Sequence, residues 1–96
     1  MSNLVSARLG KLCEDAGVSH ESVSLSAGLA GGHVGLIVSG RVKRPSADVL
    51  AKIADVLGVS LDWIVLGKGE EPDAGVVRAR VKERAMLRRP ATAEAA

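Results

Sequence analysis

Short helix-like segments that begin at serine and end at glycine are the feature that most limits the fold of this chain. Between these points apolar residues recur at three- and four-residue spacing, which is typical of helices that bury one face. Serine accepts a hydrogen bond from the free amides at the start of a helix, and glycine adopts the left-handed conformation that ends one. The three clearest pairs are Ser19 with Gly28, Ser46 with Gly58, and Ser60 with Gly67.

This pattern predicts five helices, over about residues 4–16, 20–27, 31–39, 47–57 and 61–66. The chain has one tryptophan, no phenylalanine and no tyrosine, so its core must consist of Leu, Ile, Val and Ala. Such a core suits packed helices better than a sheet. Strand patterns are weak before residue 76. The sequence therefore predicts an all-α fold with a compact five-helix domain over residues 4–67.

Beyond the domain we predict a linker over residues 68–75, a basic extension over residues 76–89 and a disordered tail over residues 90–96. Two structures for the extension stay open. It is either a helix that starts at Asp73 and stops at Pro90, or a short strand whose valines alternate with basic residues.

Either structure of the extension leaves an apolar edge that a single copy would expose. On a helical wheel Val76, Ala79, Met86 and Leu87 share one side, whereas on a strand the alternating valines do. We therefore expect the extension to support dimerisation. The residues predicted for that contact are Trp63, Val77, Val81, Met86 and Leu87. For Trp63 the alternative is packing against the core.

Composition and motif spacing argue against an enzyme, a cofactor and a membrane location. The two histidines lie 13 residues apart and the chain has one cysteine, so no metal-ligand spacing is present. No glycine-rich phosphate loop follows a strand, and no apolar run approaches the roughly 20 residues of a membrane span. Cys13 has no partner for a disulfide and is expected in the core. We predict a cytoplasmic, nucleoid-associated protein without catalytic residues, metal or cofactor.

The positive charge of the chain is local. Residues 1–73 carry seven basic and nine acidic residues, whereas residues 74–96 carry six basic and two acidic ones. Between Ser22 and Ala47 the sequence holds Arg41, Lys43 and Arg44 and no acidic residue. A surface built from this stretch favours an anionic partner.

Residues 8–66 resemble the helix-turn-helix domain of the Cro and phage-repressor type, also called XRE-like or lambda-repressor-like. The resemblance is carried by "RLGKLCEDAGVSHESVSLSAGL", by "HVGLIVSG" and by "RPSADVLAKIADVLGVSLDWIVLG". It implies that the third helix, near residues 31–39, enters the major groove of DNA. It also implies dimers on roughly palindromic operators with half-sites about one DNA turn apart.

The positions that resemble the family's DNA-contacting positions carry few long side chains. They are His20, Ala30, Gly31, Gly32, His33, Gly35 and Leu36, where members usually place polar or basic residues. His33 is the main hydrogen-bonding group left on the third helix. We expect the free amides at the start of this helix and the basic residues Arg41, Lys43 and Arg44 to hold the DNA backbone.

Three interpretations of the glycines compete. The surface binds DNA through phosphates and close backbone approach, or it binds a protein as an anti-repressor does, or the glycines have no functional meaning. The basic stretch without acidic residues favours the first. We therefore expect a sequence-specific, repressor-like regulator that binds double-stranded DNA as a homodimer. The alternative is a protein-interaction module of the same fold with weakened DNA binding.

Overall fold

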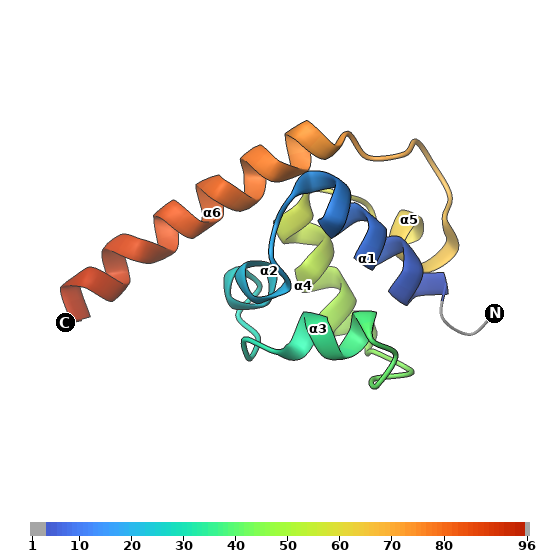
Figure 1. The fold of residues 1–96 in the computed structure, drawn as a ribbon, viewed down its shortest axis with the longest axis horizontal. Coiled ribbons are helices and arrows are strands. Elements are labelled where there is room, and N and C mark those ends of the chain that lie inside the picture. Colours follow the sequence, from blue (N-terminus) through green and yellow to red (C-terminus); the bar gives the residue numbers. More distant parts are fainter. Residues whose placement is uncertain (1–3, 96) are drawn as a thin grey trace.

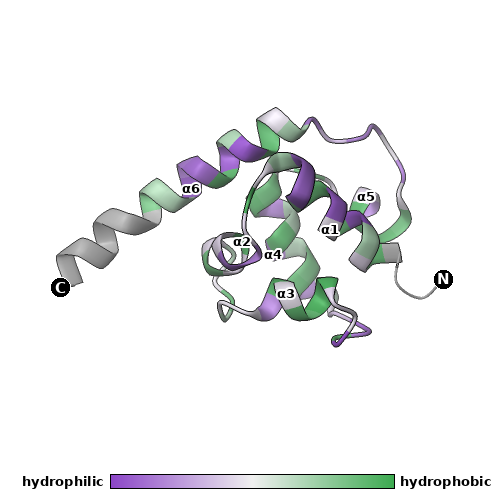
Figure 2. Cartoon of the chain, viewed as in Figure 1, coloured by the Kyte–Doolittle hydropathy of each residue, from purple (hydrophilic) through white to green (hydrophobic). Residues whose placement is uncertain are grey.

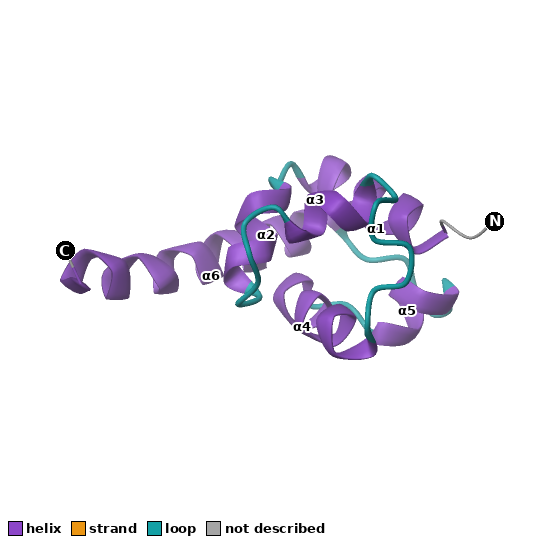
Figure 3. Ribbon diagram, turned by 90° about the horizontal axis from the view of Figure 1, so that it is seen from below, coloured by secondary structure: helices purple, strands orange, loops and turns teal. Residues whose placement is uncertain are grey.

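The computed structural model describes the backbone of residues 4–95 and the side chains of residues 5–87. Its six helices are α1 (Leu4–Ala16), α2 (His20–Ser26), α3 (His33–Val38), α4 (Ala47–Leu57), α5 (Leu61–Leu66) and α6 (Ala74–Ala95). Figure 1 shows α1 to α5 gathered into one body, with α6 starting against that body and extending away from it. The described residues contain no strand (Figure 3), so the all-α prediction is confirmed.

The helix ends are where serine and glycine predict them. The side chains of Ser19, Ser46 and Ser60 each accept a hydrogen bond from the amide three residues later, at 3.0–3.1 Å. Gly58 and Gly67 close α4 and α5 in the left-handed conformation, with φ of 73° and 72°. These caps provide hydrogen-bond partners for backbone N–H and C=O groups that would otherwise lack them at the helix ends. The short helices therefore begin and end at these residues.

The body is held together by aliphatic side chains from every helix. The largest fully buried ones in α1 to α5 are Leu9, Val23, Val34, Ile37, Ile53, Val56, Leu57 and Ile64. Trp63 is half-buried at the rim of this core and packs against it. Its side chain therefore has the core-packing role that was one of its two predicted roles.

The first turns of α6 belong to the same core. Val77 and Val81 are only 2% and 3% exposed and pack within the buried cluster. Val76, by contrast, is 59% exposed. The structure thus selects the helix from the two alternatives for the extension. It also corrects the prediction that Val77 and Val81 lie at a dimer contact, because the chain's own core already buries them.

The end of α6 also differs from the sequence prediction. The helix continues through Pro90 to Ala95, although a stop at Pro90 and a disordered tail were expected. A proline inside a helix removes one amide donor and favours a bend, yet it does not force the helix to end. Ala96 lies outside the described residues.

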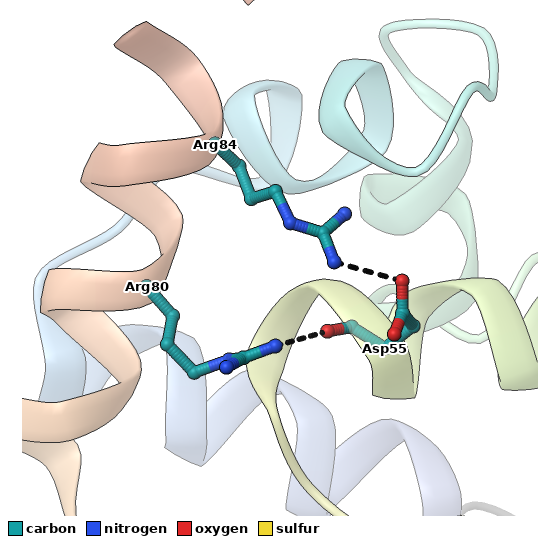
Figure 4. Close-up of polar contacts among 3 residues, drawn as sticks. All are labelled: Asp55, Arg80 and Arg84. Carbon is teal, nitrogen blue, oxygen red and sulfur yellow. Dashed lines mark hydrogen bonds and ion pairs between the residues drawn. The ribbon is translucent and has the colours of Figure 1, made fainter. Parts of the chain in front are cut away.

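Two arginines of α6 donate hydrogen bonds to the last turn of α4 (Figure 4). Arg84 Nη2 donates to Asp55 Oδ2 at 2.8 Å, and Arg80 Nη2 donates to the Asp55 carbonyl at 3.0 Å. The Arg80 side chain lies directly over Gly58, where a Cβ atom would collide with it.

The Arg84 guanidinium holds the pKa of the Asp55 carboxyl below its ordinary value through its hydrogen bond to Asp55 and its charge. The small stabilisation from this exposed pair is present above the ordinary pKa and is lost as the pH falls through the lowered one.

Arg8 of α1 makes a similar contact at the end of α5. Its Nη1 donates to the Ile64 carbonyl at 2.6 Å, and its guanidinium lies against Gly67. Positive charge beside the carbonyl end of a helix is favourable, so these arginines stabilise the ends of α4 and α5.

Cys13 is expected to stay unreactive in the folded protein. Its side chain is buried in the core, and this burial raises the pKa of the thiol to about 11. Since the thiolate is the reactive form, a thiol reagent at neutral pH should label Cys13 only after the chain unfolds. Labelling followed across a urea titration tests this, with the same reagent on a free cysteine as the rate control. Rapid labelling without denaturant would contradict the buried position.

Candidate nucleic-acid interface

α3 lies along the lower edge of the molecule in Figure 1, on the opposite side of the body from the start of α6. Val34 and Ile37 anchor it, because both side chains are fully buried in the core. Leu36, on the other side of the helix, is exposed. One side of α3 is therefore fixed to the body and the other faces solvent.

A buried serine sets the position of α3 against α2. Ser24 is fully buried; its Oγ accepts a hydrogen bond from the Val34 amide at 2.9 Å and donates to the His20 carbonyl at 2.8 Å. This role was not predicted from the sequence, although a serine next to buried Val23 on an amphipathic helix is a sign of a buried hydrogen bond. The contact ties the start of α3 to the first turn of α2.

Two of the amides that were expected to be free at the start of the third helix have partners within the chain. The Val34 amide is taken by Ser24, and the His33 amide donates to the Ala30 carbonyl at 3.0 Å. The helix also starts two residues later than predicted, so Gly31 and Gly32 form the turn before it.

The structure gathers the predicted contact residues on one surface, which we call the α3 face. It consists of His20 and Glu21 at the start of α2, Ala30, Gly31, Gly32, His33, Gly35 and Leu36 at the turn and on α3, and the basic loop 39–46. Ala30, Gly32 and Leu36 are exposed, and the remaining predicted residues of the turn and helices are half-buried. Glu21, also exposed, was not predicted from the sequence.

Two glycines of the α3 face lie beside side chains of α2. A Cβ atom at Gly31 would be 3.5 Å from Glu21 Oε2, and one at Gly35 would be 3.8 Å from His20 Nδ1. Gly32 faces open space. The space next to the glycines is thus partly occupied by the first turn of α2.

The basic loop follows directly from the end of α3. Gly40, with φ of 84°, turns the chain, and the Leu36 carbonyl accepts hydrogen bonds from the Arg41 and Val42 amides at 2.9 and 3.1 Å. The bond from Arg41 back to Leu36 and the bond from Gly40 to Ile37 form a Schellman ending. The loop is therefore held against α3, and its hydrophilic stretch is visible in purple in Figure 2.

The three cations of this loop are exposed and uncompensated. Among the residues whose side chains are described, no carboxylate pairs with Arg41, Lys43 or Arg44. Lys11 and Lys52, elsewhere on the surface, pair with Asp15 and Asp48. The basic loop is therefore a concentrated positive surface next to α3, which suits a polyanion.

The residues predicted for dimerisation do not form one surface with each other. Trp63 is half-buried against the body, whereas Met86 and Leu87 are 66% and 68% exposed on α6. Within the described residues no cluster of His, Cys, Asp and Glu is arranged to hold a metal ion. None of the described helices combines the length and apolarity that crossing a membrane requires.

Comparison with known families agrees with this geometry. The family model for the bacteriophage CI repressor helix-turn-helix domain matches residues 6–71, which includes nearly all of α1 and the whole of α2 to α5. No curated protein and no solved structure matched the chain. The match covers more than half of the chain and ends before α6. The chain therefore belongs to the bacteriophage CI repressor helix-turn-helix family of DNA-binding transcription regulators.

Proposed function

We propose that this chain is a sequence-specific repressor that docks the α3 face in the major groove of duplex DNA. The observation that carries the proposal is the basic loop, whose three exposed cations have no described acidic partner and lie at the end of α3. In this arrangement Arg41, Lys43 and Arg44 hold phosphates while α3 and the first turn of α2 meet the base edges. Phosphate contacts set register and affinity, and base contacts set the sequence.

Titration of duplex DNA at about 50 and about 200 mM salt tests this proposal. Each phosphate that a cation neutralises makes the log–log slope of affinity against salt concentration more negative by about 0.9. Three cations therefore predict a slope of roughly −3 for each bound copy. A weak response that does not change with salt would contradict it and would favour a protein partner instead.

His33 is expected to contribute to the choice of sequence. It is the first residue of α3, half-buried, and its ring can donate and accept hydrogen bonds at a base edge. We expect His33→Ala to lower affinity for the preferred sequence by about fivefold, equivalent to about 1 kcal/mol, with little effect on unrelated DNA. Competition titrations measure both. Lys43→Gln is the control, because losing a phosphate contact weakens binding to all sequences alike. If His33→Ala lowered affinity equally for the preferred sequence and for unrelated DNA, the prediction that His33 contacts a base edge would be contradicted.

The repressor is proposed to bind as a homodimer. The family resemblance supports this, and the exposed Met86 and Leu87 give the second half of α6 an apolar surface. Two copies on one duplex would place two α3 faces about one DNA turn apart. Sedimentation of the chain on a palindromic duplex should give two copies per DNA. A single copy at saturation would contradict the dimer.

A further inference from the structure

The α3 face carries one carboxylate, and its position is unexpected for a surface that meets a polyanion. Glu21 is the only acidic residue between Asp15 and Asp48. Its Oε2 and Cγ lie 3.5 and 3.6 Å from the point where a Cβ atom of Gly31 would be. The side chain thus leans from α2 toward the turn that leads into α3 and occupies space that a longer residue at position 31 would use.

Stability of α2 explains only part of this arrangement. An acidic residue in the first turn of a helix is favourable, and Glu21 is in the first turn of α2. That effect acts along the helix and does not require the carboxylate to lie beside Gly31. Glu21 is also exposed and has no ion pair or side-chain hydrogen bond with the residues whose side chains are described. Its oxygens are free to accept a hydrogen bond from a ligand.

The chemistry of the carboxylate selects what it can meet on DNA. An ionised carboxylate only accepts hydrogen bonds, so phosphate oxygens and the acceptor edge of guanine repel it. Two base-edge amino groups in the major groove can donate to it, those of cytosine and adenine. In adenine the amino group stands beside the N7 acceptor, which disfavours a carboxylate. Cytosine is the base that fits.

We propose that Glu21 is a specificity-determining residue of the DNA interface, which accepts a hydrogen bond from the amino group of a cytosine in the major groove. This inference rests on the proposed DNA-binding function. The base contact then comes from a side chain in the first turn of α2, because the glycines on and before α3 have no side chain that could make it. Glycine at position 31 then serves the interface by leaving room for a side chain from the neighbouring helix.

The test is selection of bound sequences from random duplexes by the full chain and by three variants. Glu21→Gln keeps the shape of the side chain and adds a donor, and Glu21→Ala removes the group. Glu70→Gln is the matched control, because Glu70 is an exposed glutamate on the 67–73 linker. Figure 1 shows this linker away from α3. Thermal unfolding of each variant checks that all four proteins are folded.

We expect the unaltered chain to prefer cytosine at one position of each half-site, by about fivefold or more over other bases. Glu21→Ala should lose that preference. Glu21→Gln should shift it to adenine, because an amide matches both the amino group and N7 of adenine. Glu70→Gln should leave all preferences unchanged.

A general charge effect gives a different result. If both Glu21 variants bind every duplex more tightly and keep the base preferences of the unaltered chain, Glu21 only repels phosphates and the proposal is overturned. If the unaltered chain retains no duplex at all, the DNA-binding function itself fails, which is a separate outcome. Unchanged preferences in a chain that does bind DNA overturn the reading role alone.

Discussion

Replacing Arg41, Lys43 and Arg44 together by glutamine is expected to weaken binding to every duplex by on the order of a hundredfold near physiological salt. The three side chains are exposed and lack acidic partners among the described residues. Each therefore gives its full charge to a phosphate and releases a counterion. The loss should be the same for preferred and unrelated sequences, because phosphates carry no sequence information.

The salt dependence identifies the origin of this loss. Without the three cations the log–log slope of affinity against salt should become shallower by roughly 3 for each copy. The matched control is glutamine at Lys68, Arg78 and Lys82, which removes the same charge from exposed positions on the linker and α6. Fluorescence anisotropy at several salt concentrations measures both proteins. Equal losses in the two triple variants would mean that net charge, and not the basic loop, binds the DNA.

Replacing Val77 and Val81 together by alanine is expected to lower the free energy of unfolding by about 3–5 kcal/mol. Each change removes two buried methyl groups and leaves a cavity where α6 meets the core. Domains of this size are stable by only about 5–15 kcal/mol, so the midpoint of thermal unfolding should fall by roughly 15 °C or more.

Val76→Ala is the matched control for this prediction, because Val76 is the same residue type on the same helix and is exposed. Its effect should stay within about 0.5 kcal/mol. Urea and thermal unfolding, both followed by circular dichroism, measure the three proteins. A double variant as stable as the control would mean that α6 is an appendage and does not belong to the domain.

The family match ends at residue 71, before α6 begins, so this second prediction tests whether residues beyond the matched segment stabilise the domain. α6 contributes two buried valines and the arginine contacts to Asp55, all beyond the matched segment. We infer that this domain is completed by a helix that the matched segment does not contain.

The fold of α1 to α5 was predictable because local signals set it. Serine at a helix start and glycine at a helix end act on their own backbone, so Ser46 and Gly58 bound α4 without help from distant residues. The face of α6 was not predictable in this way. Val76 and Val77 are neighbours in a basic helix, and which of them is buried depends on where α6 meets α1, α2 and α4.

In the candidate site, too, some features were predictable from the sequence and others were not. The basic loop was predictable, because a stretch of cations without acids stays charged in any fold. The roles of Ser24 and Glu21 were not, since each depends on α2 lying against the start of α3. The sequence alone indicates only that the glycine positions lack side chains. In the structure Gly31 and Gly35 lie beside side chains from another helix.

The most direct test of DNA docking on the α3 face is to map the amides of the isotope-labelled chain by NMR during titration with a selected duplex. DNA docking on the α3 face predicts chemical-shift changes at residues 20–21, 30–36 and 39–44, with little change in α5 and the 67–73 linker. Changes confined to α5, the linker or α6, with the α3 face unaffected, would contradict it.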